Sequence, residues 1–316
     1  MSVPDRHHIL AETYQKQFIA EGKCVWVHDK EEGKQFPTQP KNSTVRTGFN
    51  TALLPDGSFD KASMETFFST LETEYAQIIT QFRSGFQTSE RIGYAIAFMQ
   101  FQAARSPLVR RFMTDLLLQL TPDDERLLKV LQVENVGIEL LRRARAGDAD
   151  AKTKIGLHST KHIVDGVSNA LKGLWYRPIR LCSPMPLVTS DNPVIYFSVK
   201  RQNGKVQTGL PFEGSRVLCF FPMAKDILLF GDTERPPLDK LMNDRPSQIS
   251  NSIALVKRLN AVSAINAERS IVAPSETSLK RTMSSIAKKT ASVSTLLEMY
   301  NQLAKAALYV TSEHWK

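Results

Sequence analysis

A polar turn between two apolar runs holds the residues with the clearest chemical potential. In PLVTSDNPVIYF, residues 186–197, Ser190, Asp191 and Asn192 separate two strand-like runs, and Pro193 follows them. Ser and Asp side chains can accept hydrogen bonds from nearby amides, and proline favours an extended residue before it, so the turn has a structural explanation. Loops at strand ends are also where proteins usually present functional groups. We predict a site here, with Asp191 as a catalytic carboxylate and Ser190 and Asn192 as substrate-binding groups.

A second pair of polar residues lies in the segment FMQFQAARSP. Gln102 and Arg105 are three positions apart, so they share one face of a predicted helix whose other residues are mostly apolar. An arginine near such a core needs a partner, because an unpaired buried charge is costly. Asp191 is the first partner to test, and the alternatives are a structural ion pair or a solvent-facing arginine at the helix end. We predict that Gln102 and Arg105 bind substrate.

Histidines form the third group of candidates. His7 and His8 are adjacent near the N-terminus, so their rings point in different directions and do not serve one metal together. Either ring can act as an acid, a base or a ligand, because imidazole titrates near neutral pH. The alternative is a loosely ordered polar N-terminus. His158 and His162 share a helix face but lack the glutamate of an HExxH zinc motif, so we expect a solvated face there.

The last candidates lie in or directly after a mostly apolar segment, residues 247–268, that is predicted to be a helix. Asn260 and Asn266 interrupt the helix and Arg269 follows it. These side chains either cap and bridge neighbouring elements or line a pocket. We predict Asn260 and Arg269 as substrate-binding residues.

These residues together predict an enzyme with a polar, anion-accepting site. Asp191, with His7 or His8, would supply acid–base chemistry or hold a metal, and the guanidinium groups of Arg105 and Arg269 suit phosphate or carboxylate. Metal-assisted phosphodiester hydrolysis fits this set, with a divalent cation as the usual helper. The sequence contains no phosphate loop, HExxH, GxSxG or clustered Asp/Glu motif, so the substrate, the cofactor and any metal ligands stay open.

Charge is divided unevenly along the chain. Residues 1–150 carry 18 Lys and Arg against 20 Asp and Glu, whereas residues 151–316 carry 23 against 12. A basic second half favours an anionic ligand or a nucleic acid, although a generally basic soluble surface explains it equally well. A second hypothesis is therefore a non-catalytic protein that binds nucleic acid or takes part in phage defence, with the C-terminal helices as a docking surface. A third is that the polar residues form a buried network that only fixes the fold.

The order of the predicted elements defines the fold class. A short hairpin begins at residue 24, and apolar residues at helical spacing predict a helical block over about 60–172. Short strands with turns between them dominate residues 174–275, and helices return towards the C-terminus. A helical block followed by a mainly antiparallel sheet indicates an α+β fold and not an alternating α/β fold. We predict one α+β domain over residues 1–275 and a helical extension over 276–316.

Composition places the chain among ordinary globular proteins. Of its 316 residues, 42% are hydrophobic and 23% are charged. No run approaches the length of a membrane-spanning helix, and the N-terminus lacks the pattern of a signal peptide. The three cysteines, Cys24, Cys182 and Cys219, are far apart and form no CxxC motif, which favours reduced thiols. We expect a cytoplasmic protein with no membrane contact; the sequence leaves its oligomeric state open.

Several segments together resemble one known family. HHILAETYQKQF, VWVHDK, FMQFQAARSP, VTSDNPV, CFFPMAKDILLF and LNAVSAINAERSIVA occur in this order. The chain thus resembles the prokaryotic proteins grouped as domain of unknown function 4238, over about residues 6–275. The family pattern corresponds to the candidate residues given above together with Pro193 and Pro222, whereas Ala11 stands where the family often has proline. The resemblance implies no particular activity, but it implies that these polar residues belong to one pattern and converge in space.

Overall fold

The computed structural model describes twelve stretches of the chain. They are residues 6–49, 52–53, 59–60, 63–119, 135–149, 151–152, 155, 173–200, 206–208, 215–233, 247–250 and 253–287. The predictions made for His158 and His162, and for the last helices beyond residue 287, lie outside them.

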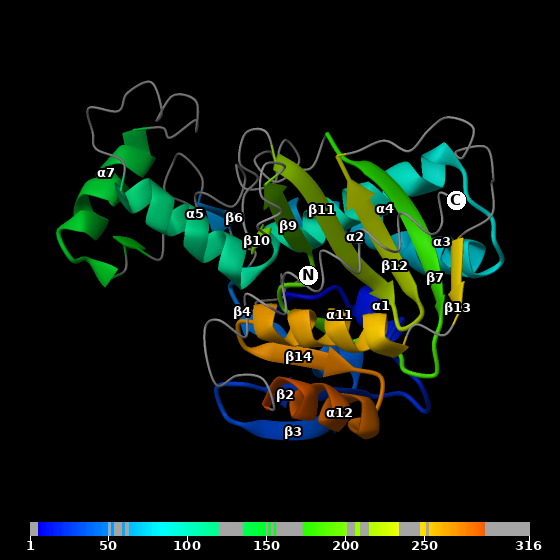
Figure 1. Ribbon diagram of the computed structural model, residues 1–316. Helices are drawn as coiled ribbons and strands as arrows, with labels where there is room; N and C mark the ends of the chain where they lie inside the picture. Colours follow the sequence, from blue (N-terminus) through cyan, green and yellow to red (C-terminus); the bar gives the residue numbers. More distant parts are fainter. Residues whose placement is uncertain are drawn as a thin grey trace.

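Helices and strands are segregated along the chain, as the α+β prediction required. Strands β1 to β6 and the short helix α1 come first, a group of helices follows, and a sheet and two further helices complete the described order (Figure 1). The described helices are α1 (Glu12–Lys16), α2 (Ser63–Thr73), α3 (Tyr75–Arg83), α4 (Ser89–Ala104), α5 (Pro107–Gln119), α7 (Asn135–Arg145), α11 (Ile253–Asn266) and α12 (Glu276–Ala287).

The larger sheet has six strands in the order β10-β9-β11-β12-β7-β13. Its neighbours pair antiparallel except β13, which runs parallel to β7. The strands are β7 (Trp175–Cys182), β9 (Ile195–Lys200), β10 (Val206–Thr208), β11 (Ser215–Ala224), β12 (Ile227–Asp232) and β13 (Ser247–Ser250). The prediction of helix from residue 247 was therefore wrong for its first four residues, which form the edge strand β13 before α11 begins.

The smaller sheet joins strands from distant parts of the sequence in the order β3-β2-β14-β8. Its strands are β2 (Val25–Asp29), β3 (Lys34–Thr38), β8 (Thr189–Ser190) and β14 (Ser270–Ala273). The hairpin expected near the N-terminus is β2–β3, and the turn between them uses the left-handed conformation of Gly33 (φ 66°). Two further antiparallel pairs are β1 (Arg6–His8) with β4 (Val45–Thr47), and β5 (Ala52–Leu53) with β6 (Phe59–Asp60).

Two hydrophobic clusters explain how the layers pack. The large core lies between the six-stranded sheet and helices α1, α3 and α4, and it also takes residues from one face of the smaller sheet. The smaller cluster lies between the other face of that sheet and helices α11 and α12, where Leu279 and Ile271 are fully buried (Figure 1). Helix α12, which follows the domain boundary predicted at residue 275, thus packs on β2, β14 and α11.

Local signals set the ends of α4. The Thr88 hydroxyl accepts a hydrogen bond from the Arg91 amide at 3.3 Å and caps its N-terminus. Pro107 starts α5 after a break of two residues. Among the described residues, no helix combines the length and the apolar character that a bilayer crossing requires.

Candidate functional site

The Ser-Asp-Asn-Pro turn is the place where the chain passes from one sheet to the other. Strand β8, which contains Ser190, belongs to the four-stranded sheet, whereas β9, which begins at Ile195, belongs to the six-stranded sheet. The two apolar runs around the turn are therefore not a hairpin. A crossing between sheets leaves backbone groups without ladder partners, and the polar side chains of the turn satisfy several of them.

Asp191 is fully buried, and its carboxylate accepts hydrogen bonds from three consecutive backbone amides. Oδ1 accepts from the Glu268 amide at 2.9 Å, and Oδ2 accepts from the amides of Arg269 at 2.8 Å and Ser270 at 2.9 Å. The Asp191 amide in turn donates to the Ser270 carbonyl at 3.0 Å. The carboxylate thus holds the turn that leads from α11 into β14 against the end of β8.

The other two residues of the turn extend this network. The Ser190 hydroxyl donates to the Asn192 carbonyl at 3.0 Å. The side-chain amides of Asn192 and Asn266 each donate to the other's backbone carbonyl, at 3.3 and 3.2 Å. The Ser106 hydroxyl, at the corner between α4 and α5, donates to Asn192 Oδ1 at 2.8 Å. Asn192 therefore joins the ends of α11 and α4.

The N-terminal segment reaches the same helix through Gln102. The Gln102 side-chain oxygen accepts from the Ala11 amide at 3.4 Å, and both residues are buried. Hydrogen bonds thus connect Ala11 to Gln102 and connect Ser106 to residues 190–192 and 266–270, while Gln102 and Ser106 lie one turn apart at the end of α4. We call this connected set, which comprises Gln102, Ser106, Ser190, Asp191, Asn192, Asn266 and the amides of residues 268–270, the polar junction.

Arg105 lies beside the polar junction and is 1% exposed. Its guanidinium donates to Glu72 Oε1 at 2.9 Å and lies 3.6 Å from the ring centroid of Phe68. The carboxylate that accompanies Arg105 is therefore Glu72 and not the Asp191 considered from the sequence. Glu72 is 21% exposed, so the outer side of this ion pair reaches solvent.

Arg110, one turn into α5, is a second buried guanidinium that the sequence reasoning missed. It donates to the Phe49 carbonyl and lies 3.8 Å from the Phe49 ring centroid, while Arg46 lies 5.9 Å from the same ring. Cations over an aromatic face are attracted by its quadrupole. In the segment PLVRRFMTD nothing distinguishes Arg110 from its neighbour Arg111, which is exposed, so the sequence carried no signal for its burial.

The two N-terminal histidines take different positions in β1. His7 is fully buried, and its partner in the ladder is Arg46. His8 is half-buried, and its Nε2 lies 3.1 Å from the Lys41 carbonyl. A carbonyl only accepts hydrogen bonds, so Nε2 carries the hydrogen and Nδ1 is the basic nitrogen of the neutral ring.

The backbone beside these histidines is strained at one residue. Thr44 has a φ of 51°, a left-handed conformation that is unfavourable for a β-branched side chain. Its carbonyl accepts from the Ile9 amide at 2.9 Å, and its hydroxyl accepts from the Leu10 amide at 3.3 Å and from the Gln15 side chain at 3.2 Å. These bonds hold Thr44 in place and fix the segment that carries His7 and His8.

Two predicted site residues have structural partners away from the polar junction. The Asn260 side chain accepts from the Val188 amide and donates to the Pro186 carbonyl, both at 2.9 Å, and so ties α11 to the segment before β8. The Arg269 guanidinium points to the β2–β3 turn, where Asp29 Oδ2 lies 2.8 Å away.

Acidic residues of that turn surround the Arg269 side chain. Glu31 and Glu32 lie 3.0 and 3.6 Å from its guanidinium, in addition to Asp29. The hydrogen bond with Asp29 raises the pKa of Arg269 above its ordinary value. Three carboxylates neutralise this cation, so its side chain is poorly placed to receive a further anion, and only its backbone amide takes part in the polar junction.

Lys30 is another charged group that sequence reasoning missed. Its ammonium donates to the carbonyls of Ala267 at 2.5 Å and Ala264 at 3.5 Å, at the C-terminal end of α11. Burial lowers the pKa of Lys30, while the charges of Asp191 and Glu268 oppose that shift. The lysine caps the helix and places a positive charge near the Asp191 carboxylate.

The described residues contain no group of three or more His, Cys, Asp or Glu side chains placed to hold a metal ion. The structure therefore identifies no ligand set for the divalent cation considered from the sequence. Near the polar junction, the described residues include two buried guanidinium groups, those of Arg105 and Arg110, and the partly exposed carboxylate of Glu72, which pairs with Arg105.

Comparison with known proteins identifies one family. The family model described as "Protein of unknown function (DUF4238)" matches residues 6–277, which is most of the chain. A search of curated proteins and a search of solved structures found no match.

Proposed function

Because the chain belongs to this family, whose description specifies no reaction, we propose a function from the residues around the polar junction: binding and hydrolysis of a phosphodiester. The observation that carries the proposal is the burial of Arg105 and Arg110 at one helix corner, 1% and 8% exposed. Guanidinium groups form paired hydrogen bonds with phosphate oxygens, and shielding from water strengthens that attraction.

Glu72 gives the anion a route to Arg105. Its carboxylate accepts a hydrogen bond from one edge of the guanidinium and is partly exposed. A phosphate could therefore reach this position from solvent and replace the carboxylate. An arriving phosphate would exchange with this carboxylate, and Arg105 would remain paired in both states. The buried cation is thus never left without an anion, which would be costly.

His8 is the residue we propose for proton transfer. Its Nε2 hydrogen is held by the Lys41 carbonyl, so the neutral ring presents Nδ1 as a base. His7, buried in the same strand, would position this segment. In this proposal Asp191 acts through the backbone of residues 268–270 and is a positioning residue. The direct catalytic role expected for it from the sequence stays a prediction. We assign no metal ligands.

A second function is favoured by the distribution of charge. The basic excess of residues 151–316 would attract a nucleic acid without any reaction, as in a nucleic-acid-binding or phage-defence protein. We propose a prokaryotic, cytoplasmic setting for either function, because the family resemblance and the unpaired pattern of cysteines both favour it.

The experiment measures cleavage of bis(p-nitrophenyl) phosphate, with and without Mg²⁺ or Mn²⁺, and binding of inorganic phosphate. Arg105→Lys should weaken phosphate binding about tenfold, because lysine cannot form the paired hydrogen bonds. Glu72→Gln should strengthen binding, because the competing carboxylate is lost. His8→Gln should retain binding but reduce turnover at least about a hundredfold.

Arg91→Lys is the matched control, since Arg91 lies at the other end of α4 and pairs with Glu74 at 2.9 Å. It should change neither phosphate binding nor turnover. Absence of turnover in the wild type, with salt-sensitive binding of a labelled oligonucleotide that Arg105→Lys leaves intact, would reject the hydrolase in favour of the nucleic-acid-binding function.

A further inference from the structure

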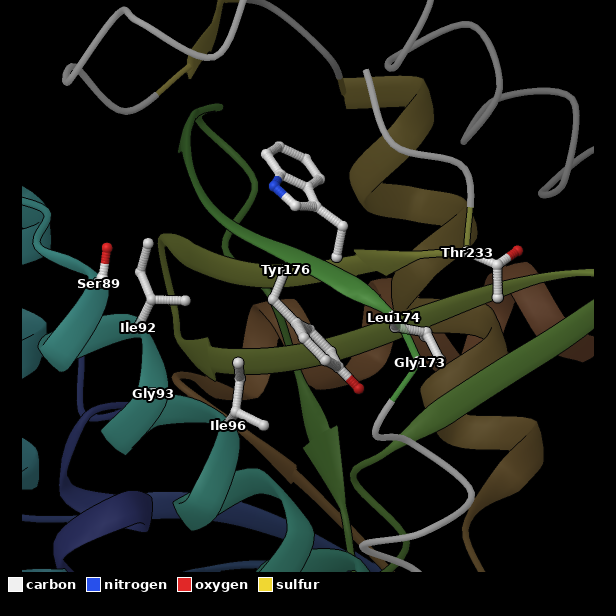
Figure 2. A pocket seen from close by; sticks show the side chains of 9 residues that line it. Ser89, Ile92, Gly93, Ile96, Gly173, Leu174, Tyr176 and Thr233 are labelled. Carbon is white, nitrogen blue, oxygen red and sulfur yellow. The ribbon is translucent and has the colours of Figure 1, made fainter. Parts of the chain in front are cut away.

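A pocket of about 540 Å³ lies along the first half of α4, away from the polar junction. It is bounded by α4, by the start of β7 and by the end of β12 (Figure 2). Ile92 and Arg105 are 13 residues apart on this helix, which at 1.5 Å per residue separates the two regions by about 20 Å. The described residues that line the pocket are Ser89, Ile92, Gly93, Ile96, Gly173, Leu174, Trp175, Tyr176 and Thr233.

The lining combines apolar and aromatic side chains with two aliphatic hydroxyl groups and two glycines. Figure 2 shows Ile92 and Ile96 on one side of the Tyr176 ring and Leu174 and Thr233 on the other. None of the described lining residues carries a formal charge. The pocket therefore favours a neutral ligand surface over a phosphate or a carboxylate, and its volume is in the range that small-molecule sites usually have.

One hydroxyl at the edge of the pocket has a fixed hydrogen-bonding role. Thr233 Oγ1 accepts from the Val217 amide at 3.0 Å, so its own hydrogen can be donated to a ligand acceptor. The Tyr176 hydroxyl interacts with the Cys219 thiol, which leaves the tyrosine ring as an apolar wall. Ser89 adds a second hydroxyl in the first turn of α4.

Two glycines in the lining are explained neither by backbone strain nor by packing within the described protein. Gly93 lies inside α4, where alanine would favour the helix, and Gly173 precedes β7. A Cβ atom built at either position would meet nothing within 4 Å, and neither glycine has a positive φ. By contrast, a Cβ at Gly231 would lie 2.5 Å from the Tyr176 ring. The missing methyl groups at Gly93 and Gly173 leave flat walls towards the pocket.

From these observations we propose that the pocket binds a neutral, flat heteroaromatic compound of about the size of a nucleoside base. One of its faces would contact the Tyr176 ring and the other the side of α4 at Gly93, as aromatic groups pack in offset or edge arrangements. Its edge would accept the hydrogen of Thr233. This pocket and the polar junction are separate, so failure of one site leaves the other intact.

The test uses adenosine and indole as flat probes and cyclohexanol as a probe that is not flat. Saturation-transfer NMR and calorimetry on the full chain should detect adenosine and indole, and cyclohexanol should bind at least tenfold more weakly. Gly93→Ala should lower the affinity for the two flat probes at least tenfold, because the added methyl group enters the pocket. The same substitution should keep or raise the melting temperature of the protein. Thr233→Val should lower the affinity for adenosine more than the affinity for indole, because indole has no acceptor nitrogen on its ring edge.

Gly137→Ala is the matched control, because Gly137 lies inside another helix, α7. It should leave adenosine and indole binding unchanged. Failure of both flat probes to bind the wild type, equal binding of cyclohexanol, or unchanged affinity in a folded Gly93→Ala variant would each overturn the proposal.

Discussion

Replacing Asp191 by alanine tests whether its carboxylate has a structural role or acts on a ligand. In the folded protein the carboxylate accepts from the amides of Glu268, Arg269 and Ser270, at 2.8 to 2.9 Å. Asp191→Ala leaves these donors without their acceptor, and each buried unsatisfied amide costs about 1–3 kcal/mol. Water entering the vacated space will satisfy part of this loss, so we expect a decrease of about 3–5 kcal/mol in the free energy of unfolding.

Asparagine at the same position gives an intermediate result. An asparagine oxygen in place of Oδ2 still accepts from Arg269 and Ser270, whereas its NH₂ group faces the Glu268 amide, donor against donor. One bond is lost, so Asp191→Asn should cost about 2 kcal/mol. Urea denaturation followed by circular dichroism measures both variants. Asp226→Ala is the control, because that aspartate pairs with Arg83 at a partly exposed site and should cost about 1 kcal/mol or less.

The opposite pattern would refute this reasoning. If Asp191→Ala unfolds at the wild-type urea concentration but loses phosphate binding or turnover, the carboxylate acts on the ligand. If the carboxylate is structural, stability should increase in the order Asp191→Ala, Asp191→Asn, wild type. Phosphate binding and turnover should then fall only in proportion to the unfolded fraction of each variant.

Two further predictions concern the sheets. His28 in β2 has a buried Nδ1 without a hydrogen-bond partner among the described residues, and burial lowers the pKa of its ring. The free energy of unfolding should therefore fall as pH decreases below about 6.5, because the unfolded chain binds the proton more readily. In His28→Gln the urea midpoints at pH 7 and pH 5 should lie closer together than in the wild type. An equal difference in the two proteins would contradict this. Gly231→Ala places a Cβ 2.5 Å from the Tyr176 ring and should cost about 1–3 kcal/mol. A melting temperature equal to that of the wild type would show that Tyr176 moves aside without penalty.

Much of the helical block could be predicted from the sequence because its signals are local. Apolar residues at helical spacing predicted a helical block over about 60–172, and the described part of that range contains α2, α3, α4, α5 and α7. The β2–β3 hairpin was similarly encoded by a short strand-like run followed by a turn. In each case the determining contacts lie within a few residues of one another.

The arrangement of strands could not be obtained in the same way. Residues 186–190 and 194–200 look like consecutive strands of one sheet, yet β8 and β9 enter different sheets because β8 pairs with β14. Likewise the run from Ser247 looked helical, and only its pairing with β7 makes it a strand. Such pairings depend on partners far along the chain, and period alone does not determine them.

The candidate site shows the same division. Residue types in the turn suggested that Asp191 has an important role, but its amide donors come from positions 268–270 and were invisible in the sequence. Glu72 was equally hidden as the partner of Arg105, since it lies on a different helix. Ser106, directly before Pro107, carried a helix-start signal that could have identified it.

The degree to which each polar group is already satisfied indicates where chemistry can occur. Asp191 has its oxygens filled by backbone donors, and Asn192 uses its side chain to join α4 to α11, so both are committed to holding the two sheets together. A ligand can exchange only with groups that reach solvent. Near the polar junction Glu72 is such a group, since its side chain is 21% exposed, and in β1 the ring of His8 is half-buried. The buried turn therefore has a structural role. The reaction we propose takes place at Arg105, where a phosphate could displace the Glu72 carboxylate without leaving the buried guanidinium unpaired.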